Sequence, residues 1–364
     1  MISFTPTDEQ ESAREAMRVF AEQAIRPVAR DCDENAAIPD SFLEQSWELG
    51  LAATQLPESV GGYGSMRSPL TNAIVLEELA CGDAALALAA TGAAGFAYAI
   101  ADQGTDAQKS TYLPAFCGEH YTAATVALNE PTPGFDVSRL RTTAALDGAD
   151  YVLTGSKCFV PMAERTGFIL VVARNGSRDD AFIVARDAPG LTISEPEKNL
   201  GLKSLATARL ELAGVRVPAA SRLGGEAGAD VGRIVNQGRV ALAAVLTGLS
   251  RAVLEYCVPY AKDRVAFDEP IAKKQSIAFR LAEMHMEIDC ARWMTWKAAS
   301  QLEQGIDATK SAHLARLFVT TKAMWIADHG VQVLGGHGFI RDNPVEMWYR
   351  NARTLGVLEG IGSV

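Results

Sequence analysis

Apolar residues recur at helical spacing through the first third of the chain. The stretch from Thr7 to Gln10 has the form of a capping box, and it precedes apolar positions at Ala13, Met17, Phe20, Ala24 and Val28. Further helices are predicted over residues 41–50, 72–80, 84–101 and 106–116, with a Gly- and Pro-containing loop at 56–65. Segment 84–101 carries no charge but is rich in Ala and Gly, which predicts a packed core helix rather than a membrane span.

The pattern changes after Tyr121 to short runs of Val, Thr and Leu between turn signals. The stretch "TTAALDGADYVLTG" predicts a hairpin that turns at Asp147-Gly148. "FILVVAR" and "AFIVAR" are typical of buried strands, and "ARLELAGVRVP" alternates until Pro218. We therefore expect a small β-barrel or sandwich in the middle of the chain.

Helical periodicity returns after the Gly-rich stretch "LGGEAGADVG". Helices are predicted over 238–263, over 273–304 and from Thr309, and a last one runs through Trp348 and Arg353. The second should bury Ile277, Leu281, Met284, Ile288, Ala291, Ala298 and Leu302, and the third a stripe of Leu314, Leu317, Phe318, Met324 and Trp325. The fold class is thus α+β: an N-terminal α-helical domain (1–120), a middle β-barrel or sandwich domain (121–228) and a C-terminal four-helix bundle (229–364).

Composition narrows the function classes. The 364 residues are 48% hydrophobic and 21% charged, as in ordinary globular proteins, and the net charge of −10 argues against nucleic acid or an anionic membrane as a partner. The six cysteines are scattered without a C-x-x-C pair, which favours a reduced compartment and no metal site. No secretory signal pattern opens the sequence, so we expect a cytoplasmic protein.

The residues alone do not name a reaction. We find no G-x-G-x-x-G after a strand, no P-loop and no G-x-S-x-G elbow. Glu359, between Leu358 and Gly360, is a candidate base if it is buried, although its stretch alone favours an exposed side chain at a frayed end. Glycine-rich turns at 335–338 and 360–362 could let a cofactor approach the backbone.

The closing stretch nevertheless resembles the C-terminal signature of the acyl-CoA dehydrogenases, flavin enzymes that desaturate acyl-CoA thioesters. The resemblance lies in "VQVLGGHGF", "NPVEMWYRNAR" and "LEG". Four other stretches resemble motifs of that family in the same order: "LPESVGGYG", "LNEPTPGFD", "YVLTGSK" and "DRVAFDEPIAKKQSIAFRLAEM". Because five motifs occur in order and the three-part layout agrees, the chain is identified as a member.

The resemblance implies a mechanism and a cofactor, FAD. Glu359 matches the usual base that removes the α-proton of the thioester while the flavin accepts the β-hydride, giving an enoyl-CoA. The alternative base position of some relatives falls in "VNQGRVAL", which offers no acid. The implied substrate contacts are Arg239 and Gly360. Implied cofactor contacts are Val126, Leu128, Asn129, Gly134, Phe135, Phe159, Pro161, Ile361 and Ser363, and, toward the FAD of a neighbouring subunit, Arg264, Phe267, Gln275, Gln332, Gly335 and Gly336.

Simpler interpretations remain open for the residues that are implied to contact the FAD of a neighbouring subunit. Arg264 could be a surface charge of the bundle, Gln332 a helix-end cap, and Gly335-Gly336 a C-cap.

Departures from the family pattern cluster at the flavin: Asn129 replaces Thr, Phe135 replaces Ser, and Pro161 replaces a hydroxyl residue. Asp268 stands where Gly is usual, and Ile361-Gly362-Ser363 replaces T-S-x, losing a hydroxyl and an amide side chain that normally face the cofactor. Each lost polar contact would weaken FAD binding by about 1 kcal/mol.

Two hypotheses follow. The chain is either a homomeric dehydrogenase with its own FAD or one subunit of an α2β2 enzyme that shares a partner's FAD. A flavin oxidase or monooxygenase on the same fold is disfavoured because Glu359 is retained. The expected partners are an acyl-CoA substrate, an electron acceptor that is itself a flavoprotein, and further subunits that form a homotetramer or heterotetramer. Gly238 and Leu358, which are small or aliphatic, hint at room for a branched acyl group.

Overall fold

Helices form the N-terminal part of the computed structural model, which describes residues 5–364. Thr7 caps the first helix, and the capping box is confirmed by hydrogen bonds in both directions between Thr7 and Gln10. A π-helical turn (Ala21–Ile25) joins this helix to the second. The helices are α1 (Asp8–Phe20), α2 (Arg26–Asn35), α3 (Asp40–Trp47), α4 (Pro69–Gly82), α5 (Ala84–Ala90), α6 (Gly92–Gln103) and α7 (Asp106–Tyr112).

The Ala-rich segment is two helices rather than the one helix predicted. It breaks at Thr91, whose hydroxyl bonds back to the Ala87 carbonyl, and α5 and α6 are bent by 42° there. Its predicted place in the core is confirmed, because all of α5 and most of α6 are buried. By length and composition this pair and α8 (Val231–Asp263) could each cross a membrane, but 78% of the most apolar window of α8 is buried inside the protein.

The middle part is one curled sheet of seven strands. Its order is β1-β4-β2-β3-β7-β6, with β5 paired along the whole of β4, and β1 runs parallel to β4. The predicted hairpin is present: β2 and β3 pair in antiparallel fashion, with Gly148 at φ 65° in the turn. The strands are β1 (Ala124–Ala127), β2 (Thr143–Asp147), β3 (Asp150–Pro161), β4 (Phe168–Asn175), β5 (Arg178–Ala185), β6 (Leu191–Ile193) and β7 (Thr207–Pro218).

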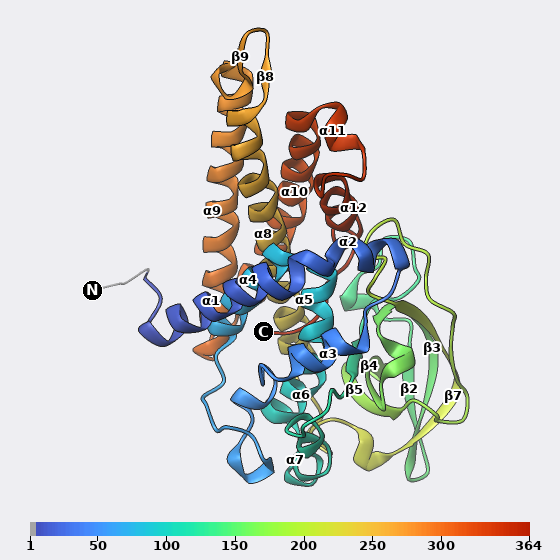
Figure 1. Ribbon diagram of the computed structural model, residues 1–364. Helices are drawn as coiled ribbons and strands as arrows, with labels where there is room; N and C mark the ends of the chain where they lie inside the picture. The colour runs from blue at the N-terminus through green and yellow to red at the C-terminus, as the bar shows by residue number, and fades with distance from the viewer. Residues whose placement is uncertain (1–4) are drawn as a thin grey trace.

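The C-terminal part is a helical bundle that stands above the other two parts (Figure 1). It consists of α8, α9 (Gln275–Glu303), α10 (Thr309–Leu334) and α12 (Val345–Leu355), with a short α11 (Gly336–Phe339). A two-stranded ribbon, β8 (Val265–Ala266) and β9 (Glu269–Pro270), forms the outer tip between α8 and α9. The expected three-part α+β fold is thereby confirmed.

The predicted apolar stripe of α10 is wrong in phase. Leu314 and Leu317 are 44% and 45% exposed, whereas the buried residues include small ones such as Ala312, Ala315 and Ala323. Small side chains let α10 pack closely against α8, as where Gly330 meets Val253. The larger leucines are left on the outside. On α9 the predicted seam holds from Met284 to Leu302, while Ile277 and Leu281 are half-buried.

The last residues of the chain pass through the junction of the three parts. After α12, the segment 356–364 runs back between α8 and the loop that follows β1, and it ends near the centre of the molecule (Figure 1). Residues 358–361, 363 and 364 are all buried. The candidate base therefore lies in the interior, where bundle, sheet and N-terminal helices meet.

Candidate functional site

Glu359 is buried, with 8% of its surface exposed. The interpretation of this residue as an exposed side chain at a frayed end, which its local sequence favoured, is wrong. The turn after α12 places Leu358 in the main core and directs the following residues inward. Burial of the carboxylate requires charge partners, because an isolated ionised group in the interior would be strongly destabilising.

Two arginines of the bundle supply those partners. Arg239 of α8 donates from Nε to Glu359 Oε1 at 2.8 Å and also bonds the same oxygen through Nη2. Arg316 of α10 places Nη2 3.3 Å from Oε2 and donates from Nε to the Leu358 carbonyl at 3.0 Å. Burial lowers the pKa of Arg316; the Glu359 charge opposes this effect, and the Arg239 charge adds to it. Both carboxylate oxygens thus face a guanidinium group in a water-poor environment.

Arg316 was not among the residues predicted from sequence. A signal was present, however, since Arg316 follows Ala312 by four residues and precedes Val319 by three. Both neighbours are buried, so Arg316 is a charge on the inner face of α10. A cation at such a position needs an anion from another element, and Glu359 provides it.

Asn129 holds the backbone on either side of the candidate base. It lies in the loop after β1 and is 8% exposed. Its Oδ1 accepts the N–H of Glu359 at 3.1 Å, and its Nδ2 donates to the Gly360 carbonyl at 3.4 Å. The side chain predicted to contact the cofactor is therefore engaged with the C-terminal segment.

A buried ion pair fixes the loop that carries Asn129. Lys157 of β3 is fully buried, and its Nζ lies 3.0 Å from Glu130 Oε1 and 3.2 Å from the Leu128 carbonyl. Glu130 also accepts the N–H groups of Arg141 and Thr142. Burial acts to raise the pKa of Glu130, but the Lys157 charge and these N–H groups outweigh it, so the pKa lies below its usual value.

A cavity of about 40 Å³ adjoins this loop and the C-terminal segment. It brings together eight of the predicted residues: Val126, Leu128, Asn129, Phe159, Pro161, Gly360, Ile361 and Ser363. Leu88, Gly92, Gly95 and Ile234 complete its apolar wall. The side chain of Glu359 faces Arg239 and Arg316 instead of the cavity, although the next residue lines it.

Gly238 does not open additional space for a substrate. A Cβ at this position would lie 3.6 Å from the Gly362 carbonyl oxygen and 3.7 Å from Gly360. Leu358 is 2% exposed and belongs to the core. These contacts give no support to the hint of room for a branched acyl group, which stays a prediction, because the C-terminal segment lies beside α8 at Gly238.

The predicted residues at the edge of the cavity differ in their surroundings. Phe135 is half-buried and packs on an apolar cluster that includes Leu128 and Val235. Gly134 has φ 63° and open space where a Cβ would be. Phe159 has φ 52°, a backbone conformation that is uncommon for a bulky residue, and its N–H donates to Glu197 Oε2 at 3.0 Å. The strand thus leaves its regular path where it passes the cavity.

The other predicted cofactor residues lie apart from the cavity, at the outer end of the bundle. Arg264 caps α8, Phe267 lies in the turn between β8 and β9, and Gln275 begins α9; Gln332 lies in the last turn of α10, followed by Gly335 and by Gly336 at the start of α11 (Figure 1). All six are exposed. Gly335 is the C-cap of α10, as the simpler interpretation expected, whereas the side chain of Gln332 makes no capping bond within residues 5–364.

The ribbon tip is strained. Phe267 and Asp268 both have positive φ, 54° and 64°, and Phe267 is 89% exposed. Asp tolerates this conformation better than most residues, whereas a bulky ring does so at a cost of order 1 kcal/mol. An exposed aromatic side chain held in this way is a feature of binding sites more than of folding.

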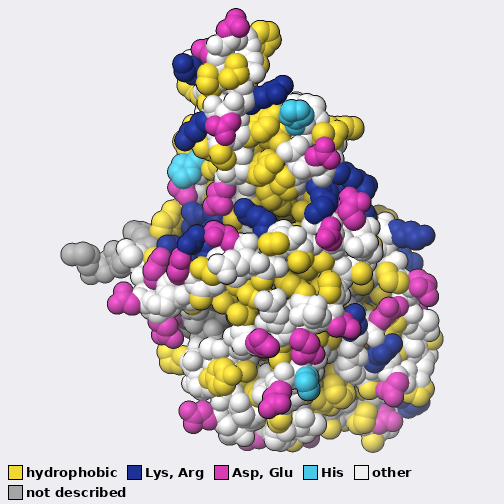
Figure 2. Space-filling model, viewed as in Figure 1, with side chains coloured by type: hydrophobic (Ala, Val, Ile, Leu, Met, Phe, Trp, Pro, Cys, Tyr) yellow, Lys and Arg dark blue, Asp and Glu magenta, His cyan; other side chains and the backbone are white. Residues whose placement is uncertain are grey.

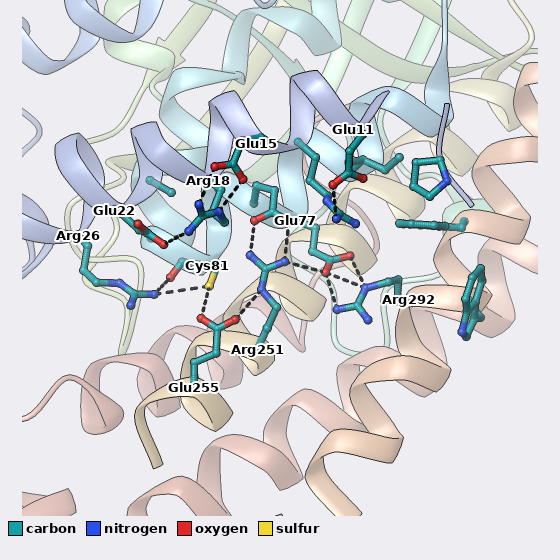
Figure 3. A pocket seen from close by; sticks show the side chains of 18 of the residues that line it. Glu11, Glu15, Arg18, Glu22, Arg26, Glu77, Cys81, Arg251, Glu255 and Arg292 are labelled. Atoms are coloured by element: carbon teal, nitrogen blue, oxygen red, sulfur yellow. Dashed lines mark hydrogen bonds and ion pairs between the residues drawn. The ribbon is translucent and has the colours of Figure 1, made fainter. Parts of the chain in front are cut away.

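A second cavity, of about 810 Å³, lies between α1 and the faces of α4, α8 and α9 (Figure 3). Its charges pair with one another: Arg251 and Arg292 both bond Glu77, and Arg251 also bonds Glu78. Burial raises the pKa of the Cys81 thiol to about 11, so this side chain is a poor nucleophile. This region joins the N-terminal helices to the bundle and offers no chemistry of the kind expected at Glu359.

The residues fit the FAD that the resemblance implies. Leu128, Phe159 and Pro161 offer an apolar wall for a flat ring. Arg264 is an exposed cation without an ion-pair partner in the described part of the chain, and its fork of donors suits a diphosphate. A Cβ at Gly335 or Gly336 would meet no atom within 4 Å, so the backbone there is open to close approach.

Comparisons with known proteins agree with this geometry. The models for the N-terminal, middle and C-terminal domains of acyl-CoA dehydrogenase match residues 7–120, 125–215 and 229–364. A Bacillus subtilis protein named as a probable acyl-CoA dehydrogenase is 34% identical over all of this chain and 97% of its own length. The mitochondrial short-chain specific acyl-CoA dehydrogenase of Bos taurus is 32% identical over 96% of this chain and 86% of its own.

Solved structures give the same result. Butyryl-CoA dehydrogenase from Megasphaera elsdenii superposes with a TM-score of 0.89 at 30% identity, covering 99% of this chain and 97% of that one. These matches confirm the resemblance inferred from five sequence motifs. The chain therefore belongs to the acyl-CoA dehydrogenase family, whose members are FAD-dependent oxidoreductases that act on acyl-CoA.

Proposed function

We propose that this protein oxidises an acyl-CoA thioester to the enoyl-CoA, with Glu359 as the base that removes the α-proton. The observation that carries the proposal is the burial of Glu359 beside the cavity lined by eight predicted cofactor and substrate residues. Bound FAD would supply the acceptor for the hydride from the β-carbon. The chain itself would supply the base, its orientation and a dry environment.

Glu359 must turn to act. Its oxygens face Arg239 and Arg316, so the carboxylate has to leave at least one guanidinium group to reach a substrate in the cavity. Asn129 would keep the Glu359 backbone in place during this movement, because it bonds the main chain and not the carboxylate. Arg239 would then be free to contact the substrate, the role that the family resemblance implies for it.

The substrate class is proposed from the relatives and from the C-terminal segment, which occupies the space beside Gly238. Two of the relatives described above are named for short-chain and butyryl-CoA substrates. We therefore propose a short, unbranched acyl-CoA as the substrate.

The second candidate function is a subunit of an α2β2 dehydrogenase that shares its partner's FAD. The observation that favours it is the loss of polar groups at three predicted cofactor positions, although Thr125 and Ser363 also line the cavity. Phe135 packs in an apolar cluster, Pro161 has no donor, and Asn129 is occupied by the C-terminal segment. Arg264 and Gln332, by contrast, remain exposed and able to reach a cofactor seated on another chain.

Assembly and location complete the proposal. Exposed apolar side chains gather on the bundle, including Phe267, Phe279, Met286, Leu317 and Phe339, and yellow surface is visible there in Figure 2. Such a patch is typical of a subunit interface. We propose a tetramer, homomeric or with a related subunit, that acts in the cytoplasm and passes electrons to a flavoprotein. We also propose that the three domains are divided after residues 120 and 228, as the sequence indicates.

One experiment separates the two candidates. The chain is purified alone, its visible flavin spectrum is recorded, and butyryl-CoA is added without oxygen. Bleaching of a bound flavin in the wild type, but not in Glu359→Gln, would support the homomeric enzyme. A colourless protein that gains flavin only with a co-expressed partner would support the α2β2 subunit. A flavin that bleaches equally in Glu359→Gln would contradict the role of Glu359.

A further inference from the structure

The segment that follows the candidate base is buried and contains two glycines. Ile361, Ser363 and Val364 are 6%, 7% and 0% exposed. Gly360 and Gly362, the latter with φ 71°, give the backbone more freedom than other residues would. This freedom means that contacts with other parts of the chain must fix the path of the segment along the cavity that it lines.

The first of these contacts is with α8. The N–H of Ile361 donates to the Gly238 carbonyl at 3.3 Å. This carbonyl belongs to the residue before Arg239, the main partner of Glu359. The start of the segment is thus fixed next to the ion pair.

The second contact is with Arg67, in the loop before α4. Its Nη2 donates to the backbone oxygen of Val364 at 3.0 Å. Nη1 donates to Gln55 Oε1 at 2.7 Å, and Nε to Asp102 Oδ1 at 3.1 Å. The guanidinium carbon lies 3.7 Å from the centre of the Tyr98 ring. Four contacts in different directions leave a planar guanidinium with one orientation.

These contacts close a ring. Asp102 accepts from Arg67 through one oxygen and from Gln237 Nε2, at 3.0 Å, through the other. Gln237 directly precedes Gly238, which holds Ile361. The ring therefore runs from Arg67 through Asp102 and α8 to Ile361, and back along the segment to Val364.

We propose that Arg67 is a positioning residue for Glu359. It holds the far end of segment 360–364 and so fixes the direction from which the chain leaves Glu359, while Asn129 and Gly238 hold the near end. The inference rests on the proposed function of Glu359. The hydrogen bonds of the Arg67 side chain go to Gln55, Asp102 and Val364, and none of these three residues lines the cavity.

Arg67→Met tests the proposal, and Arg233→Met is its matched control. Arg233 also lies near Asp102, with its Nε at 3.9 Å, but its hydrogen bond goes to the Leu302 carbonyl and not to segment 360–364. In Arg67→Met, Asp102 keeps Gln237 and Arg233 as neighbours, so we expect the protein to fold. Arg67→Lys is a second variant, which retains the charge but not the fork of donors.

Two readouts are required. Hydrogen exchange measured by mass spectrometry on the peptide 355–364 should be at least about tenfold faster in Arg67→Met, because a buried backbone oxygen has lost its donor. The kcat with butyryl-CoA should fall about tenfold, with KM changed by less than about threefold, since the loss concerns the orientation of the base. Arg67→Lys should lie between, and Arg233→Met should match the wild type in both.

Unchanged exchange in Arg67→Met would overturn the proposal, as would equal acceleration in Arg233→Met. A change in KM with unchanged kcat would also overturn it, because that result indicates lost binding and not a displaced base. If the wild type oxidises no thioester, the proposed function has failed. The exchange comparison alone then decides whether Arg67 anchors the segment.

Discussion

Replacing Lys157 with methionine should destabilise the protein by about 3 kcal/mol, the lower end of the range for breaking a buried ion pair. Lys157 and Glu130 are 0% and 4% exposed, and their charged atoms lie 3.0 Å apart. Methionine fills most of the volume but leaves Glu130 as a buried charge without its cation. The lower end of the range applies because Glu130 keeps the N–H groups of Arg141 and Thr142, at 2.8 and 2.9 Å.

Removing both charges should cost less than removing one. Burial lowers the pKa of Lys157 to about 8 even though Glu130 is adjacent, which shows that desolvation of the ammonium group is expensive. Lys157→Met combined with Glu130→Gln removes this desolvation cost and retains an acceptor for the loop. We expect the double variant to lose about 1 kcal/mol relative to the wild type.

The assay is urea unfolding followed by far-UV circular dichroism at pH 7, on the wild type, both single variants and the double variant. The pKa of Glu130 lies below its usual value in the folded state. Glu130 therefore contributes to stability above its pKa in the unfolded state, near 4.5, and this contribution is lost as the pH falls through its pKa in the folded state. The difference between the wild type and Lys157→Met should therefore shrink as the pH falls toward and through the folded pKa of Glu130. A double variant that is as unstable as the sum of the two singles would refute the reasoning.

Three further predictions concern other buried groups. Burial raises the pKa of Asp83 to about 6, so its contribution to stability is largest below the unfolded pKa and is lost as pH rises through 6; Asp83→Asn should flatten the stability profile between about pH 4 and 6 in thermal unfolding. Glu77→Gln should lower the free energy of unfolding by about 2–4 kcal/mol in urea unfolding, because buried Arg251 loses an ion-pair partner. An equal loss in Glu15→Gln, at an exposed position, would contradict this prediction. Asn129→Thr should reduce kcat by about tenfold, with flavin content retained, because the shorter side chain cannot hold the Glu359 backbone; unchanged kcat would argue against that contact.

The sequence could predict features that depend on local rules or on specific motifs. The capping box at Thr7 and the hairpin at Asp147-Gly148 follow from hydrogen bonding and turn geometry within a few residues, and both are present. Eight motif residues that are far apart along the chain meet at one cavity. The motifs that contain these residues occur in the same order as in the family. Because the family fold brings such residues together, the sequence predicted that they would meet.

Features that depend on packing between elements were not predictable in the same way. The residues of α10 that face inward include four alanines, while Leu314 and Leu317 face outward, so hydrophobicity alone gave the wrong phase for this part of the helix. Arg316 was missed because its partner lies 43 residues further along, on an irregular segment. The space expected beside Gly238 is filled by residues 360–362, which no local pattern places there.

The predicted cofactor residues form two groups, and their separation bears on how the protein works. The group around the cavity contains the candidate base, and two of its donors, the Asn129 side chain and the N–H of Phe159, already have partners. The group at the outer end of the bundle contains free donors, Arg264 and Gln332, but no buried acid. A cofactor with both an apolar ring and a diphosphate needs contacts of both kinds. Because one chain presents them at separate places, the separation is consistent with our proposal of an assembly in which the bundle end of a second chain, a copy or a related subunit, completes the site.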